Sequence, residues 1–212
     1  MKTEHLITAL VADRSSIERP ISRTIALYTA GGALLSGLLF FWLIGLRPDF
    51  ATASETLRFQ FKFVVTIALL IPAFVIAWRL STPEGQQGGW LWALLIAPTA
   101  LAAACVVDLA VLDPAEWKAK LVGSNSIICV TVIPLLSLPP LTALLFALSQ
   151  GLTTRPTLAG LAAGLASAAL AATLYASNCT DDSPLFVATW YTMAIAAVTM
   201  VGAIIGSYVL RW

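Results

Sequence analysis

The sequence predicts an all-α membrane protein whose chain crosses the bilayer as a bundle of six helices. Hydrophobic residues make up 59% of the 212 residues and charged residues only 11%, whereas a soluble domain is roughly 25% charged. The mean hydropathy is +0.88. Six apolar stretches reach the length of about 20 residues that a membrane helix needs. Because so few charges cannot cover a water-soluble globule, lipid must surround most of the chain.

The six predicted spans, in chain order, cover about residues 25–46, 61–80, 90–111, 127–148, 157–176 and 185–210. Turn-forming and polar residues separate them at Arg47-Pro48-Asp49, Pro83-Glu84-Gly85, Asp113-Pro114, Thr154-Arg155-Pro156 and Asp181-Asp182-Ser183-Pro184. The first span is longer than the roughly 7–15 apolar residues of a signal-peptide core. We therefore expect it to remain in the protein as a membrane helix.

We expect two parts, an N-terminal segment of residues 1–24 and a membrane domain of residues 25–212. Six spans place both termini on one side of the bilayer. Basic residues mark the cytoplasmic side, and the side of the termini carries seven of them against five on the other. Four of the seven precede the first span: Lys2, Arg14, Arg19 and Arg23. The sequence thus predicts a multi-pass protein of the bacterial inner membrane with both termini in the cytoplasm.

Small residues recur every four positions along three of the spans. They are Gly160, Gly164, Ala168, Ala172 and Ala176 in the fifth span, Gly202 and Gly206 in the sixth, and Gly32 and Ser36 in the first. This spacing lets the backbones of membrane helices approach closely. We favour packing within one bundle over a dimer interface, and the oligomeric state stays open.

Prolines interrupt several spans, at Pro72, Pro98, Pro134, Pro139 and Pro140. Each removes a backbone hydrogen bond and can kink its helix. The three prolines of the fourth span predict a strong bend. Kinked helices can gate pores, but we favour a role in shaping the bundle.

Charges and catalytic motifs are absent where a pump or an enzyme would need them. The middles of the spans carry no ionisable residue, which argues against an ion-coupled transporter. Lys62 and Asp108 lie near span ends, where we expect snorkelling or a loop to solvate them. There is no H-E-x-x-H, G-x-S-x-G or C-x-x-C sequence. We expect no enzyme and no cofactor; a facilitator of neutral solutes and a membrane thiol oxidoreductase stay as alternatives.

Three cysteines are predicted at one depth, on the periplasmic side. Cys105 lies near the outer end of the third span, Cys129 lies near the outer start of the fourth, and Cys179 lies in the loop before the sixth. A Cys129–Cys179 disulfide or a shared metal site is chemically allowed in an oxidising compartment, while packing as a small apolar residue is the alternative. We favour packing for Cys105 and function for Cys179, which lies beside Asp181 and Asp182; Cys129 stays open.

The N-terminal segment has an amphipathic pattern. Leu6, Ile7, Leu10 and Val11 recur at helical spacing, and the pattern ends at Asp13. A short helix of this kind is marginal alone in water, but it can lay its apolar face into a groove of a partner. A surface-lying helix or a disordered leader is the other interpretation. The near-neutral charge balance argues against nucleic acid as a direct partner.

Three blocks of the sequence resemble the NrsF-type membrane anti-sigma factors, a family of negative regulators of sigma F. They are the tail from Thr3 to Asp13, the run from Cys129 to Pro140, and the block Cys179 to Tyr191, CTDDSPLFVATWY, which is the most specific. The likeness extends over the whole chain in length, number of spans and spacing of these blocks.

This resemblance implies that the chain holds an extracytoplasmic-function sigma factor at the membrane, away from RNA polymerase core. The cytoplasmic tail would bind the sigma factor through Leu6, Ile7, Leu10, Val11 and Asp13. The paired periplasmic cysteines of the family, matched here by Cys129 and Cys179, would sense metal or redox stress, with transient binding of a heavy metal as one route and Asp181 and Asp182 as accessory residues. The resemblance assigns no role to Cys105.

Overall fold

The computed structural model describes residues 21–82 and 88–211, and this part of the chain is helical and contains no strand. Six of its helical segments are long and apolar enough to cross a membrane. The predicted all-α bundle of six spans is therefore confirmed. The sigma-binding residues predicted in the tail, Leu6, Ile7, Leu10, Val11 and Asp13, lie outside the described residues.

The long helices are α2 (Ile21–Leu43), α4 (Leu57–Arg79), α6 (Ile96–Val111), α8 (Ser126–Ser149), α9 (Pro156–Ala176) and α11 (Thr192–Val209). Shorter helices extend or connect them: α3 (Phe50–Ser54), α5 (Trp90–Ala93), α7 (Pro114–Val122), α10 (Pro184–Phe186) and the π-helix η1 (Val187–Tyr191). The third predicted span is thus split into α5 and α6. The second begins before its predicted start because the side chain of Thr56 caps α4, accepting a hydrogen bond from the amide of Phe59 at 3.4 Å.

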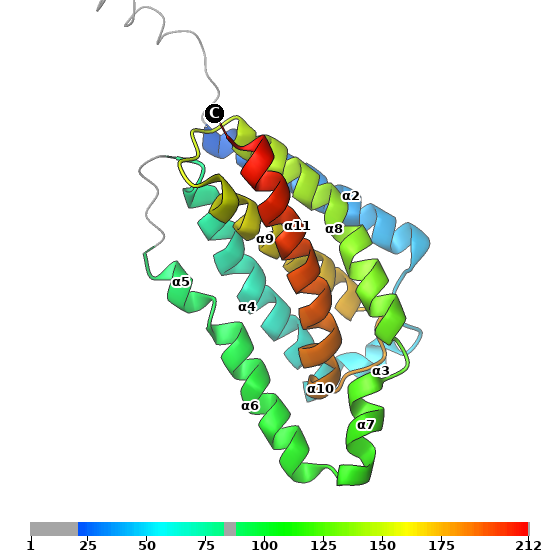
Figure 1. Ribbon diagram of the computed structural model, residues 1–212. Coiled ribbons are helices and arrows are strands. Elements are labelled where there is room, and N and C mark those ends of the chain that lie inside the picture. The colour runs from blue at the N-terminus through cyan, green and yellow to red at the C-terminus, as the bar shows by residue number, and fades with distance from the viewer. Residues whose placement is uncertain (1–20, 83–87, 212) are drawn as a thin grey trace, which may run out of the picture.

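Helix α9 is the most buried of the long helices and lies among α4, α8 and α11, as Figure 1 shows. Its sequence is rich in alanine and glycine, so neighbouring helices can approach its backbone. The segment formed by α5 and α6 is the least buried and runs along the outside of the bundle, beside α4 (Figure 1). The core is therefore built on α9, and the exposed faces of the outer helices are left to lipid.

The predicted glycine contacts occur inside the bundle, between α9 and α11. A Cβ atom on Gly160 would overlap the carbonyl oxygen of Gly202. One on Gly206 would lie 2.5 Å from the Cα of Gly160, and one on Gly164 would lie 2.8 Å from the carbonyl oxygen of Val198. Real Cβ contacts are not this short, so only glycine permits this separation of the two backbones.

Helices α2 and α8 meet where the prolines of α8 disturb its hydrogen bonding. Pro140 has no amide hydrogen to donate to the carbonyl of Leu136, four residues before it. The buried hydroxyl of Ser36 donates to that carbonyl instead, at 2.7 Å. Gly32 allows the approach, because a Cβ there would lie 2.8 Å from the Cα of Pro140. Helix α8 continues as one α-helix through its three prolines.

Replacement of Ser36 by alanine is expected to destabilise the bundle by about 1–3 kcal/mol, because the buried carbonyl of Leu136 loses its partner. The measurement is the thermal unfolding of the purified protein in detergent. Ser207→Ala is the matched control, since the Ser207 hydroxyl is exposed and bonds within its own helix. Equal melting temperatures for the two variants would contradict the assigned role of Ser36.

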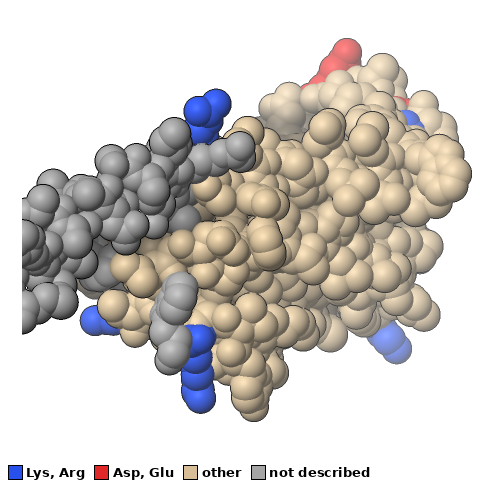
Figure 2. Space-filling view, turned by 90° about the horizontal axis from the view of Figure 1, so that it is seen from above, with Lys and Arg blue, Asp and Glu red and all other residues tan. Residues whose placement is uncertain are grey.

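The two ends of the bundle differ in charge. At the tail end, where α2 begins and α4 and α11 end, the exposed charges of the described residues are Arg23, Arg79, Arg155 and Arg211. Every described Asp and Glu lies at the other end, called here the cysteine end: Asp49, Glu55, Asp108, Asp113, Glu116, Asp181 and Asp182. Figure 2 looks onto the tail end and shows blue side chains around it, with red only at one far edge.

Candidate functional site

The loop of residues 177–183, between α9 and α10, organises the cysteine end. The amides of Asn178 and Cys179 both donate to the carbonyl of Tyr175, at 3.0 Å each, which closes the last turn of α9. The side-chain amide of Asn178 donates to the carbonyl of Gly45 at 3.1 Å. The amide of Arg47 donates to the carbonyl of Ser177 at 3.2 Å. These bonds join the loop to the segment that follows α2.

Cys129 and Cys179 come together in one buried cluster, although 50 positions separate them in the printed sequence. Their side chains are 0% and 1% exposed. Both are free thiols. Cys105 packs against the same cluster but is only half-buried, and its thiol lies 3.4 Å from the carbonyl oxygen of Pro184.

Two tyrosines complete the surroundings of the thiols. Tyr175 at the end of α9 and Tyr191 at the end of η1 are almost fully buried, with ring centroids 5.9 Å apart. Neither phenol oxygen has a hydrogen-bond partner among the residues that the structure describes. Tyr191 is placed by a π-helix, a feature that is frequent at functional sites. The thiols therefore lie in a tightly packed cluster that also contains two buried phenol groups.

The prediction that Lys62 is solvated is wrong. Its side chain is 1% exposed, and the ammonium group lies 2.5 Å from Oδ1 of Asp182 and 2.9 Å from the carbonyl oxygen of Cys179. The ring of Phe59 lies against it, 5.3 Å from Nζ to the ring centroid. A buried ammonium must be paired and hydrogen-bonded to persist. Lys62 points into the protein because these partners replace water.

The other carboxylate oxygen of Asp182 pairs with a second cation, Arg47. Nη1 of Arg47 donates to Oδ2 of Asp182 at 3.0 Å, and the rest of the guanidinium holds Asp49 through two bonds of 2.7 Å. The hydrogen bond to Asp49 is the main cause that raises the pKa of Arg47, and Arg47 in turn lowers the pKa of Asp49. Arg47 therefore stays charged and links the end of α2 to the loop.

Asp108 is also buried, contrary to the expectation that water or a loop solvates it. It is 5% exposed. Nη2 of Arg58 donates to one of its oxygens at 2.7 Å, and the hydroxyl of Ser183 donates to the other at 3.1 Å. These bonds join α6, α4 and the start of α10, so the charge is compensated inside the protein.

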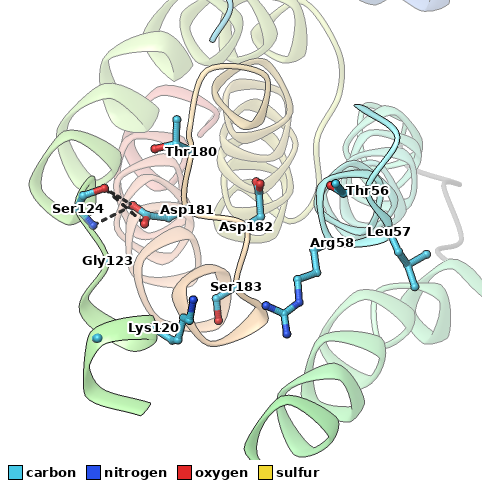
Figure 3. Close-up of a pocket in the computed structure, with 11 residues that line it drawn as sticks. Thr56, Leu57, Arg58, Lys120, Gly123, Ser124, Thr180, Asp181, Asp182 and Ser183 are labelled. Carbon is cyan, nitrogen blue, oxygen red and sulfur yellow. Dashed lines mark hydrogen bonds between the residues drawn. The ribbon is translucent and has the colours of Figure 1, made fainter. Parts of the chain in front are cut away.

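Asp181 has a structural role at the start of α8. Its Oδ2 accepts hydrogen bonds from the amides of Ser124 and Asn125, at 3.0 and 2.9 Å, and from the side-chain amide of Asn125 at 2.9 Å. Figure 3 shows this carboxylate turned toward Ser124. Because α8 carries Cys129 one turn further on, Asp181 ties the two cysteine-bearing segments together.

An open cleft of about 720 Å³ lies beside the loop, between the start of α4 and the end of α7 (Figure 3). Arg58, Lys120, Asp181 and Asp182 line it together with hydroxyl groups. The thiols are not among its lining residues, so the cleft gives solvent access to the loop but not to Cys129 or Cys179.

The arrangement determines what the thiols can do. Burial raises the pKa of Cys179 above its ordinary value, only partly offset by the nearby charge of Lys62, and the reactive form of cysteine is the thiolate. No group of three or more His, Cys, Asp or Glu side chains in the described residues is arranged to hold a metal ion. Two thiols are fewer than the four ligands of a structural zinc site.

Sequence reasoning singled out Cys129, Cys179, Asp181 and Asp182, and the structure brings all four to one end of the bundle. It missed Lys62 and Arg47, the partners of Asp182. A charged residue within a span is often paired with another charge, but Lys62 lies near the end of its predicted span, where snorkelling into water is an equally good interpretation.

Comparison with known proteins places the chain in a family. A family described as "Negative regulator of sigma F" matches residues 10–212. A protein of Azospira oryzae named "Probable anti-sigma-F factor NrsF" is 32% identical over 217 residues, covering all of both chains. The "Anti-sigma-F factor NrsF" of Caulobacter vibrioides is 32% identical over 214 residues, again covering all of both. No solved structure matches the chain. The chain therefore belongs to the NrsF family of negative regulators of sigma F.

Proposed function

We propose that this protein is a membrane anti-sigma factor that binds an extracytoplasmic-function sigma factor through residues 1–24 and keeps it from RNA polymerase core. The observation that carries the proposal is the full-length similarity to two proteins named as anti-sigma-F factors. The helical spacing of apolar residues in the tail supports a groove-binding mode. The protein acts as a regulator and not as an enzyme.

The tail lies in the cytoplasm, and the protein resides in the bacterial inner membrane. Basic residues gather on the cytoplasmic side of membrane proteins. Among the described residues, the charges of the tail end are Arg23, Arg79, Arg155 and Arg211, all of them exposed. Two of the basic residues at the cysteine end, Arg47 and Lys62, are buried in ion pairs. This distribution supports a cytoplasmic tail end and a periplasmic cysteine end.

The cysteine end senses metal or redox stress through Cys129 and Cys179. The two buried thiols belong to segments that also share the hydrogen bonds of Asp181. A metal ion or an oxidant that engages the thiols must move the loop of residues 177–183 relative to α8. That movement shifts the packing of α8 and α11 and weakens the hold of the tail on the sigma factor.

The test is capture of the sigma factors of the source organism by the full-length protein in detergent. Binding of one of them is expected, and Leu10→Glu is expected to abolish it because a carboxylate enters the apolar face. Ala12→Glu is the matched control: it adds the same charge on the opposite side of the predicted helix. Capture that survives both Leu10→Glu and deletion of residues 1–20 would overturn the proposed role of the tail.

A further inference from the structure

We infer that Lys62 is a positioning residue: its ion pair with Asp182 holds the loop of residues 177–183 closed over Cys179, so the pair must open before the thiol can react. The inference rests on the proposed sensing role of Cys179 for its biological meaning. The contact itself depends only on the fold.

Lys62 bonds the thiol-bearing loop at two points. Its ammonium group pairs with the carboxylate of Asp182 at 2.5 Å and donates to the backbone carbonyl of Cys179 at 2.9 Å. Lys62 therefore contacts both the backbone of the cysteine and the side chain three residues later. Arg47 bonds the same two groups, at 3.4 Å to the Cys179 carbonyl and 3.0 Å to Asp182, so Lys62 supplies the shorter contact to each. Cys179 is 1% exposed in this arrangement.

Because the Lys62–Asp182 pair is largely buried, loss of either partner destabilises the protein, but the two losses differ in cost. Lys62 is 1% exposed, while Asp182 keeps 21% of its side-chain exposure and also pairs with Arg47. Loss of one member of a buried pair leaves the other charge without compensation. Loss of Lys62 is the milder change, because Arg47 remains as the counter-ion of Asp182. Loss of the carboxylate leaves a buried ammonium with the Cys179 carbonyl as its hydrogen-bond acceptor.

The position of Lys62 also explains how the closed loop keeps reagents in the water-filled cleft away from the Cys179 thiol. The cleft beside the loop reaches Asp182 and Thr180 but not Cys179. A reagent that enters the cleft reaches Asp182, whose carboxylate pairs with the buried Lys62 behind it. The frequency with which the pair opens therefore sets the rate at which Cys179 can be modified.

The experiment measures the rate at which a maleimide labels Cys179 in the purified full-length protein in detergent. Cys105→Ser and Cys129→Ser in the background leave Cys179 as the single thiol, since the chain has three cysteines. Lys62→Met, which keeps the length and apolar stem of the side chain, is expected to speed labelling by at least about tenfold. Lys118→Met removes an exposed lysine of α7 and is expected to leave the rate unchanged.

A double-mutant cycle distinguishes loss of the Lys62–Asp182 contact from a general loosening of the bundle. Asp182→Asn should also speed labelling, and the double variant should fall clearly short of the product of the two single effects, because both act through one contact. Labelling of Lys62→Met at the background rate, or effects that multiply independently, would overturn the inference. Helix content and thermal unfolding identify a variant that has lost its fold. If Lys62→Met has lost it, Lys62→Gln takes its place, because its amide can still donate to the Cys179 carbonyl while the ion pair is gone; labelling of Lys62→Gln at the background rate would then overturn the inference.

A cellular measurement distinguishes failure of this inference from failure of the proposed function. If Cys179 is the sensor, Lys62→Met should lower the metal concentration that induces sigma-dependent transcription. Faster labelling with an unchanged dose response would uphold the ion-pair role of Lys62 and remove the proposed sensing role of Cys179.

Discussion

Alanine in place of Gly160 is expected to destabilise the bundle strongly, although alanine is the best helix former. A single added methyl group would overlap the carbonyl oxygen of Gly202, and the backbone around Gly206 is almost as close. The clash is with backbone atoms, which no rotamer change relieves. Helices α9 and α11 must therefore separate, at a cost of about 1–3 kcal/mol typical of overpacking, and a leucine at this position should prevent assembly.

The measurement compares thermal unfolding of Gly160→Ala and Gly31→Ala in detergent. Gly31 is the matched control because it is exposed on α2 and has nothing within 4 Å of its added Cβ. Gly31→Ala should be neutral or stabilising by up to about 1 kcal/mol through helix propensity. If both variants melt alike, α9 and α11 do not pack through their glycines.

The α9–α11 contact was predictable because its signal is local. Glycine at every fourth position can be recognised in one span without knowledge of its neighbour, and in lipid it indicates the close approach of another helix. The same holds for the spans themselves, since length and hydropathy are properties of a continuous segment. What the spacing left open was the partner: Gly160 and Gly164 pair with α11.

The ion pairs at the cysteine end were not predictable in this way. Lys62 and Asp182 are far apart in the sequence, and nothing local to Lys62 distinguishes a lysine that reaches out to water from one that reaches into the protein. The hydrogen bond from Ser36 to Leu136 is similar, because it depends on which helix lies beside the prolines of α8. Such contacts follow from the packing of helices and not from the pattern of any one of them.

Serine in place of Cys179 is expected to abolish induction of the sigma-dependent genes by a thiophilic metal such as Zn²⁺, while repression without metal persists. Serine is close in size to cysteine, so the closed loop and the hold on the sigma factor should remain. Metal binding by thiols requires the thiolate, which a hydroxyl does not supply at neutral pH. A coupling free energy of about 1–3 kcal/mol between the thiols and the tail corresponds to about 5–150-fold induction. This is the response that the variant is expected to lack.

The comparison of three single variants, measured with a sigma-dependent reporter across metal concentrations, tests this directly. Cys129→Ser should fail like Cys179→Ser, because both thiols belong to one buried cluster, whereas Cys105→Ser should induce normally. Burial raises the pKa of Cys179, so the protonated form predominates at neutral pH. Metal binding releases that proton, and the wild-type response should therefore strengthen as the external pH rises. Normal induction in Cys179→Ser would show that the signal enters the bundle elsewhere.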